Sequence, residues 1–326
     1  MEKMVTMDFT ILKEQFENKK VFVTGHTGFK GSWLLLILKE LGAKVVGYAL
    51  APENEADLFN QIDGAQYCEK SIIANILDAE QLKKEISAFQ PDYIFHLAAQ
   101  ALVRKSYENP IETYLVNTIG TANVLEAMRL LPNACVGIMV TTDKVYENPE
   151  RGTAFEEADK LGGYDPYSAS KATCEIVIDS YRNSFFNAQA FNTHKKSIAS
   201  VRAGNVIGGG DFSKDRIIPD IVRSIQNKTA ISLRNPEATR PWQHVLDPLC
   251  GYLLALEAIL GGEDIDSLNF GPNGDSLTVQ QVFEIANTAW GTIHNLHVET
   301  PEPHNSIQLE ALELGLNSSR AGKILN

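Results

Sequence analysis

A glycine-rich turn near the start of the chain places the strongest constraint on its fold. The turn reads Gly25-His-Thr-Gly28-Phe-Lys-Gly31, and it lies between a short β-branched strand at 20–24 and an apolar helix that Gly42 stops. Glycines let the backbone approach a pyrophosphate, and free N–H groups at the start of the helix meet its negative charge. Such a turn alone can be merely structural, but the strand–turn–helix context predicts a dinucleotide site.

Apolar segments continue to alternate after this turn. Further strands are predicted at 43–50, 91–100, 136–142 and 197–202, and helices at about 110–130 and 165–187. This alternation predicts an α/β fold, a doubly wound parallel sheet of the Rossmann type with helices on both faces. The 326 residues are 44% hydrophobic and 21% charged, so the chain is able to bury a full core.

The composition of the sequence changes after about residue 203, where the predicted loops become longer and richer in proline, glycine and asparagine. We therefore predict an amphipathic arm at 1–18, a dinucleotide-binding domain at 19–202, and a smaller α/β substrate-binding part at 203–326 over the carboxyl edge of the sheet. Residues 241–262 are expected to rejoin the dinucleotide-binding domain, and the stretch 251–260 within them reads as a buried helix.

The charge balance and the cysteines exclude several classes of function. The chain has 29 Lys+Arg against 41 Asp+Glu, a net charge of -12, so nucleic acid and anionic membranes would repel it. The four cysteines (Cys68, Cys135, Cys174 and Cys250) are too widely spaced for a metal knuckle or a redox pair, so no metal is expected. The N-terminus lacks the apolar stretch of a signal peptide. We expect a cytoplasmic protein with reduced thiols.

A second motif, Tyr167-Ser-Ala-Ser-Lys171, places a tyrosine and a lysine on one helix face. Lys171 is expected to reach a cofactor ribose and to lower the pKa of Tyr167, a candidate base beside a nicotinamide. The pattern alone is more typical of a solvated helix face. A preceding strand that ends in Thr141-Thr142 favours the catalytic interpretation, and Asn117 in the helix before it completes the usual set.

A third motif, Thr142-Asp143-Lys144, follows a strand at the carboxyl edge, where doubly wound folds hold their sites. An acid beside a potential base suits the elimination of water, because one group removes a carbon-bound proton while the other protonates the leaving hydroxyl. The alternative is a surface ion pair in a loop.

A fourth motif, Arg240-Pro-Trp-Gln-His244, has Arg234 upstream. Isolated arginines in proline-rich loops of an acidic chain indicate a diphosphate clamp. The alternative is that these arginines form surface salt bridges, and for Arg234 alone we prefer that interpretation.

The cofactor type depends on the second strand, which ends Gly47-Tyr48-Ala49-Leu50. It lacks the acidic residue that usually binds the ribose, so this strand alone does not choose NAD over NADP. It also lacks an arginine, which argues against a 2′-phosphate. Asn75 is a candidate for the adenine edge, and the small Ala98 and Ala99 leave room for the adenosine.

Together these residues resemble the extended short-chain dehydrogenases/reductases, and within them the CDP-glucose 4,6-dehydratases. The resemblance runs from about residue 20 to about residue 275 and is carried by TGHTGFKGSWL, HLAAQALVRKSY, TTDKVYEN, LGGYDPYSASKA, RAGNVIGGGD and RNPEATRPWQHVLDPLCGYL. Lys144 is the most specific match, since the related dTDP-glucose and GDP-mannose dehydratases carry glutamate there. Two departures are His304-Asn-Ser, where the family usually reads His-Glu-Ala, and a chain that stops at Asn326, where members continue with a helical segment.

The resemblance implies a tightly held NAD that is reduced and reoxidised while CDP-glucose becomes CDP-4-keto-6-deoxyglucose. Tyr167 would be the base at the C4 hydroxyl, water would leave across C5–C6, and hydride would return to C6. Asp143 is the expected acid at the C6 hydroxyl, and Lys144 either the C5 base or the stabiliser of the enolate. A nucleotide-sugar 4-epimerase or reductase is the alternative, since it needs no Asp143-Lys144. A catalytically silent binding protein is a third reading, against which the intact Tyr167 and Lys171 count.

The expected site residues follow from these motifs and from the resemblance. The catalytic residues are Thr142, Asp143, Lys144, Tyr167 and Lys171. The cofactor-binding residues are Gly25, Thr27, Gly28, Phe29, Lys30, Gly31, Asn75, Ile76, Leu97, Ala98, Ala99, Asn117, Tyr167 and Lys171. The substrate-binding residues are Gln100, Arg104, Asn205, Arg216, Arg234, Arg240 and His244. The helices at 110–130 and 165–187 commonly pair subunits in this superfamily, so a homodimer or homotetramer is expected, with a role in deoxysugar and O-antigen biosynthesis.

Overall fold

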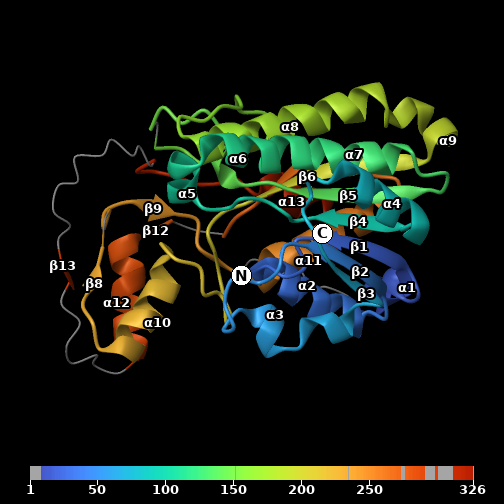
Figure 1. Ribbon diagram of the computed structural model, residues 1–326. Coiled ribbons are helices and arrows are strands. Elements are labelled where there is room, and N and C mark those ends of the chain that lie inside the picture. The colour runs from blue at the N-terminus through green and yellow to red at the C-terminus, as the bar shows by residue number, and fades with distance from the viewer. Residues whose placement is uncertain are drawn as a thin grey trace.

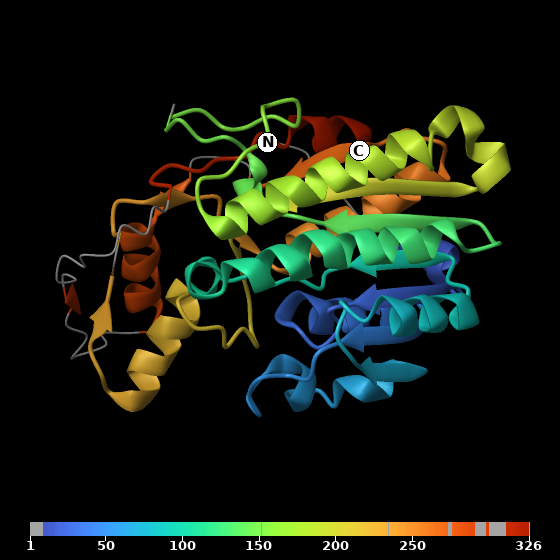
Figure 2. The ribbon, with the colours of Figure 1, turned by 45° about the horizontal axis from the view of Figure 1, so that its top comes forward.

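Seven parallel strands form one central sheet in the order β11-β6-β5-β4-β1-β2-β3, with helices on both faces (Figures 1 and 2). The computed structural model describes residues 9–150, 152–233, 235–272, 276–290, 298–299 and 311–325. The strands are β1 (Lys20–Thr24), β2 (Lys44–Ala49), β3 (Lys70–Ile73), β4 (Tyr93–His96), β5 (Cys135–Val140), β6 (Lys196–Ala203) and β11 (Ser267–Phe270). The predicted doubly wound fold is confirmed, and the strand order reverses between β1 and β4.

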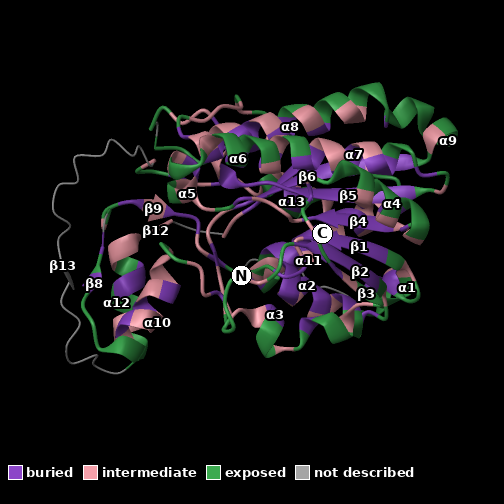
Figure 3. Cartoon of the chain, viewed as in Figure 1, coloured by how far each residue is buried: buried purple, intermediate pink, exposed green. Residues whose placement is uncertain are grey.

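Two apolar cores hold the helices to the sheet, one on each face. One face carries α1 (Phe9–Phe16), α2 (Phe29–Glu40), α11 (Leu246–Leu260) and α13 (Ser319–Ile324), and the other α4 (Ala79–Phe89), α7 (Gly120–Arg129) and α8 (Pro166–Ser184). Every residue of β5 (CVGIMV) is buried, as expected for a strand covered on both sides. Figure 3 shows this burial along the middle strands.

The part of the predicted N-terminal arm that the structure describes belongs to the packed core. Helix α1 buries Leu12 and Phe16 completely, in the same core as α2 and α11. The Tyr93 hydroxyl donates to the Gln15 carbonyl at 3.0 Å, which ties the helix to β4.

The predicted helix at 110–130 has three parts: α6 (Pro110–Tyr114), a π-helical turn at Leu115–Ile119, and α7. The other short helices are α3 (Leu58–Gln61), α5 (Val103–Glu108) and α9 (Phe191–His194). Short 3-10 turns lie at Gly64–Tyr67, Asp143–Val145 and Ala188–Ala190. A π-helical turn inside an α-helix is frequent at functional sites, and this one carries Asn117.

After β6 the chain builds a small lobe beside the sheet (Figure 1). Its elements, with the short strands that join it to the sheet domain, are β7 (Val206–Ile207), α10 (Ile217–Asn227), β8 (Ile231–Ser232), β9 (Thr239–Arg240), β10 (Gln243–His244), β12 (Leu277–Thr278), α12 (Val279–Ala289) and β13 (Val298–Glu299). Helices α10 and α12 share a separate apolar cluster around Ile221, Leu233 and Phe283. The chain also returns to the large sheet, since β11 pairs with β6 through Leu268 and Val201.

Within the described residues, no helix combines the length and the apolar character needed to cross a bilayer.

Candidate active site

The glycine-rich turn lies between β1 and α2, where the backbone of Gly25 is left-handed (φ +75°). A Cβ atom at Gly25 would lie 2.7 Å from the Ala98 nitrogen, and one at Gly31 would lie 2.1 Å from the Gly25 carbonyl oxygen. These two glycines are therefore required by the packing of the turn itself. A Cβ at Gly28 would meet only the Gly25 oxygen, at an ordinary 3.4 Å. The protein's own packing does not demand glycine at 28, so its bare backbone fits the close approach of a ligand.

The other predicted cofactor residues line the carboxyl edge around this turn. The Thr27 hydroxyl donates to the Leu50 carbonyl at 2.8 Å, and the Ala98 amide donates to Thr24 Oγ1 at 3.2 Å. Phe29 and Leu97 pack on the core below the turn, and Ile76 is buried against α7.

Asn75 is exposed just after the end of β3, and one end of its side chain is hydrogen-bonded within the protein. Its Oδ1 accepts from the Leu77 amide at 2.9 Å, and the Tyr48 hydroxyl donates to its carbonyl at 3.1 Å. These bonds fix the orientation of Asn75. Its Nδ2 group is left to donate a hydrogen bond to a ligand.

Lys30 projects from the first turn of α2 toward the same edge. Its Nζ lies 3.4 Å from the Tyr252 hydroxyl. Burial and the positive charges of Arg216 and Lys171 lower the pKa of Lys30 to about 7. The site therefore concentrates cations in an otherwise acidic chain.

Helix α8 presents Tyr167 and Lys171, both buried. Asp165 caps the helix, because its carboxylate accepts from the Ser168 amide at 2.9 Å. The Tyr167 hydroxyl bonds the side chain of Thr142, and Lys171 Nζ donates to the Val140 carbonyl at 3.3 Å. The end of β5 and the first turns of α8 therefore hold the predicted catalytic set together.

The sequence predicted that Lys171 lowers the pKa of Tyr167, and this prediction is wrong: without NAD, the groups of the protein raise that pKa. Burial raises the pKa of Tyr167, and the nearby Asp143 carboxylate adds to that effect. The hydrogen bond with Thr142 and the charge of Arg216 oppose the rise without cancelling it. Burial also lowers the pKa of Lys171. The low dielectric surroundings disfavour both charged forms, which the spacing of the motif does not reveal.

Asn117 is buried in the π-helical turn and holds the loop after β4. Its Nδ2 donates to the Gln100 carbonyl at 3.1 Å and to Ser170 Oγ at 2.9 Å, while its Oδ1 accepts from the Gln100 amide at 2.8 Å. The Gln100 side chain, expected to bind substrate, is instead bonded to Leu102 and Thr113. Both amides therefore shape the loop that follows β4.

Asp143 and Lys144 meet at the carboxyl end of β5. Lys144 Nζ lies 3.0 Å from Asp143 Oδ1 and 3.2 Å from Asn205 Oδ1. Thr142 Oγ1 donates to the same Asp143 oxygen at 2.8 Å. Asp143 is fully buried, and its Oδ2 has no hydrogen-bond partner among the described residues. A buried unpaired carboxylate oxygen is costly, and it fits a ligand hydroxyl.

The predicted substrate arginines lie on separate elements, Arg104 on α5 and Arg216 and Arg240 in the part of the chain after β6. Arg240 is buried, and its Nη1 donates to the carbonyls of Thr239 (2.8 Å) and Leu312 (3.3 Å). Arg216 pairs with Asp211 at 3.1 Å and Arg104 with Asp215 at 2.8 Å, both partners lying in the loop before α10. Arg234 and His304 lie outside the described residues. The His244 ring lies against Trp33 over α2, with centroids 6.3 Å apart, and does not line the cavity described next.

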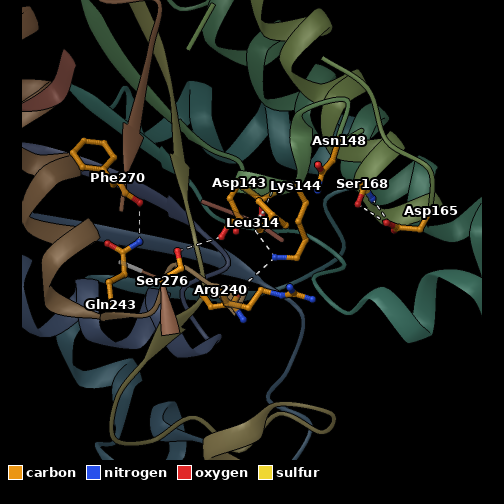
Figure 4. A network of polar contacts seen from close by, with 12 residues as sticks. Asp143, Lys144, Asn148, Asp165, Ser168, Arg240, Gln243, Phe270, Ser276 and Leu314 are labelled. Carbon is orange, nitrogen blue, oxygen red and sulfur yellow. Dashed lines mark hydrogen bonds and ion pairs between the residues drawn. The ribbon is translucent and has the colours of Figure 1, made fainter. Parts of the chain in front are cut away.

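A cavity of about 230 Å³ is lined by Asp143, Lys144 and Arg240 among the predicted site residues, whereas Tyr167, Lys171 and Arg216 do not line it. Figure 4 shows Asp143, Lys144 and Arg240 around this space, with Leu314 beside them. The lining residues are Val103, Asp143, Lys144, Tyr146, Asn148, Glu150, Phe155, Gly163, Tyr164, Asp165, Ser168, Arg240, Ala311 and Leu314.

Sequence reasoning missed most of the cavity wall. The rings of Tyr146 and Phe155 stack with centroids 4.9 Å apart and form an apolar side. The segment 311–316 packs against the same two rings through Leu314 and Leu316. Glu150 holds this segment by accepting from the amides of Leu312 and Glu313, both at 2.9 Å. Tyr146 lies inside the TTDKVYEN stretch, so that motif could have indicated it. The segment 311–316 carries no motif that could have done so.

Comparisons with known proteins agree with this geometry. The family model described as GDP-mannose 4,6 dehydratase matches residues 22–311. A CDP-glucose 4,6-dehydratase of Salmonella typhimurium is 47% identical over 86% of this chain and 78% of its own length.

Two solved structures share the fold. A UDP-glucose 4-epimerase of Thermotoga maritima aligns with a TM-score of 0.79 at 21% identity, over 94% of this chain and 92% of that one. A dTDP-glucose 4,6-dehydratase of Streptomyces venezuelae, solved with NAD, aligns with a TM-score of 0.77 at 22% identity, over 94% and 90%. The match over most of the chain, together with the close relative, identifies this protein as a member of the nucleotide-sugar dehydratase family of the short-chain dehydrogenase/reductase type.

Proposed function

We propose that the protein is an NAD-dependent hydro-lyase that converts CDP-glucose into CDP-4-keto-6-deoxyglucose. The observation that carries the proposal is the Asp143–Lys144 pair, which lies directly beside the Thr142–Tyr167 contact. A proton acceptor for the hydroxyl that is oxidised, next to an acid–base pair, is what oxidation followed by loss of water requires. The choice of CDP-glucose rests on the relative at 47% identity, which is named for that substrate.

NAD fits the carboxyl edge of the sheet between β1 and β4. The backbone at Gly28 carries no side chain, so the pyrophosphate of NAD would be able to approach it closely. The turn from Gly25 to Gly31 would hold the pyrophosphate, while Asn75, Ile76, Ala98 and Ala99 would border the adenosine and Lys171 the ribose. NAD, when bound, supplies a hydride acceptor for C4 and a hydride donor for C6. Its positive nicotinamide ring would favour the Tyr167 phenolate, against the burial that raises the pKa of that tyrosine.

Gly28→Ala tests this placement of the cofactor. A methyl group at 28 fits the fold, so the melting temperature should stay close to that of the wild type. It would occupy the space of the pyrophosphate, so we expect NAD affinity, measured by calorimetry, to fall by about tenfold or more, the loss of one good hydrogen bond to a charged group. Gly322→Ala in α13, where a Cβ meets nothing within 4 Å, is the matched control. Unchanged NAD affinity in Gly28→Ala would place the pyrophosphate elsewhere.

In the oxidation step, Tyr167 would take the proton of the C4 hydroxyl, with Thr142 orienting that hydroxyl through its contact to the phenol. In the elimination, a proton that crosses the 3.0 Å contact from Lys144 to Asp143 would turn the ion pair into an amine and a carboxylic acid. Lys144 would then remove the C5 proton while Asp143 protonates the departing C6 hydroxyl. These two transfers restore the ion pair, so the elimination needs no proton from water. As hydride returns to C6, protonated Lys144 would give a proton back to C5, and the proton that Tyr167 took from the C4 hydroxyl would restore Lys144.

The diphosphate would bind near Arg240 on β9 and Arg216 at the start of α10. Asn205 would contact the sugar, since it already bonds Lys144. Arg104 would contribute through the loop before α10, to which it is bonded at Asp215.

The function is tested by incubating the protein with CDP-, dTDP-, UDP- and GDP-hexoses and measuring product masses. We expect loss of one water from CDP-glucose and a 4-keto-6-deoxy product. A product of unchanged mass from any of the four would instead indicate an epimerase.

We further propose that the protein forms a homodimer through α6–α7 and α8. The residues Ile111, Leu115, Ile119 and Ile176 on these helices are between 43% and 72% exposed. Large aliphatic side chains exposed on packed helices are typical of a surface that binds another copy of the chain. Sedimentation should give a dimer for the wild type and a monomer for Ile119→Glu; a wild-type monomer at all concentrations would contradict this assignment.

A further inference from the structure

A buried ion pair lies behind the active site and links α8 to the strands. Glu175 on α8 and Arg202 on β6 are each 4% exposed, and Arg202 Nη2 lies 2.8 Å from Glu175 Oε2. Ser200 Oγ donates to the same oxygen at 2.7 Å, and the Thr141 hydroxyl donates to Glu175 Oε1. The carboxylate thus accepts three hydrogen bonds from β6 and from the end of β5.

Glu175 is ionised in this setting. Burial acts to raise its pKa, but the charge of Arg202 and the three hydrogen bonds outweigh burial and hold the pKa below its usual value. A buried carboxylate that is this well bonded also fixes the positions of its donors, because leaving any of them unpaired is costly.

The pair is coupled to the catalytic residues through Val140, the last residue of β5, and Thr141, which follows it. Glu175 follows Lys171 by four positions and lies on the same face of α8. Lys171 donates to the Val140 carbonyl, and Glu175 accepts from Thr141, the residue directly before Thr142. The register between α8 and the end of β5 is therefore set by these two side chains.

Glu175 also acts on Lys171 through its charge. The titratable groups that face Lys171 are Cys174 and Glu175 on α8, His96 on β4 and Lys30 on α2. Burial lowers the pKa of Lys171, and Cys174 and Glu175 raise it. Burial keeps Cys174 a neutral thiol by raising its pKa, so Glu175 is the negative charge in this group.

We propose that Glu175 is a positioning residue of the reaction, which holds Thr142 in register with Tyr167 and keeps Lys171 protonated. The proposal rests on the proposed function, since it concerns the same hydride step. Arg202 supports it from β6, and its Nη1 also donates to the Tyr146 hydroxyl at 2.8 Å, so the network reaches the wall of the cavity.

Glu175→Gln is the decisive variant, because it keeps the shape of the side chain and removes the charge. We expect kcat for CDP-glucose to fall by about 10–100-fold, the usual effect of a small misplacement in an active site, with KM unchanged. The substitution removes the negative charge that raises the pKa of Lys171, and it leaves the positive charge of Arg202 unpaired. Both changes lower the pKa of Lys171. The alkaline limb of the kcat profile should therefore move to lower pH. NAD affinity, measured by calorimetry, should begin to fall at a lower pH than in the wild type.

Two further variants separate position from charge. Thr141→Val keeps the ion pair and removes the bond between Thr141 and Glu175, so it should lower kcat without moving the alkaline limb. Glu175→Asp keeps the charge at a shorter reach and should behave in the same way. Asp264→Asn breaks the surface ion pair between Arg182 of α8 and Asp264, and it should match the wild type.

A folded Glu175→Gln protein with wild-type kcat and pH profile would overturn the proposal. If that variant does not fold, wild-type kcat in Thr141→Val would overturn it instead. A wild-type protein that dehydrates no nucleotide sugar would refute the proposed function, whereas the pH dependence of NAD binding would still test Glu175.

Discussion

Tyr167→Phe is expected to abolish turnover of CDP-glucose while the protein stays folded and keeps NAD bound. The substitution removes a single hydroxyl from a buried ring, so the packing of α8 survives. It leaves the C4 hydroxyl without a proton acceptor, and loss of general base catalysis costs about 10²–10⁴-fold in rate. Because oxidation comes first, the variant should form no NADH on mixing with substrate, as followed by NADH absorbance.

The matched control for this prediction is Tyr181→Phe. Tyr181 lies on the same helix, and its hydroxyl is 3.4 Å from Glu126, away from the site. It should turn over at the wild-type rate. Near-normal turnover in Tyr167→Phe would remove that tyrosine from the mechanism and would point to Thr142 or to water as the base.

Asp143→Asn should stall the reaction after oxidation. The amide still accepts a hydrogen bond from Thr142, and Tyr167 and Lys171 are untouched, so C4 oxidation should survive. An amide is a poor acid and cannot exchange a proton with Lys144, so elimination should slow by about 10²–10⁴-fold. We expect bound NADH to accumulate together with a 4-keto sugar that keeps its C6 oxygen.

Two measurements decide this second prediction: NADH absorbance after mixing with CDP-glucose, and the mass of the product. Asp179→Asn, an exposed change on α8, serves as the control and should accumulate no NADH. Wild-type elimination in Asp143→Asn would mean that another group protonates the leaving hydroxyl. Loss of oxidation itself would mean that the Asp143 carboxylate is needed earlier, to hold Thr142 against Tyr167.

The sequence alone determined the elements whose signal is local. Continuous apolar runs predicted β1, β2, β5 and β6 within one or two residues, because a strand buried on both faces needs no polar positions. The run 91–100 was placed less well, since β4 ends at His96, four residues before the predicted end. The glycine-rich turn, Tyr167 with Lys171, and Asp143 with Lys144 were found for the same reason. In each case a few adjacent residues carry the chemistry, and the carboxyl end of a strand brings them together.

Tertiary structure decided what depends on contacts between distant residues. Strand β11 is four residues long and contains Asn269, so only its pairing with β6 places it in the sheet. Burial reversed the expected direction of the Tyr167 pKa shift. The bonds of Gln100, the cavity wall from 311–316 and the ion pair between Glu175 and Arg202 all join segments that no local pattern relates. A side chain's partner across the fold is set by packing, and periodicity along the chain carries no record of it.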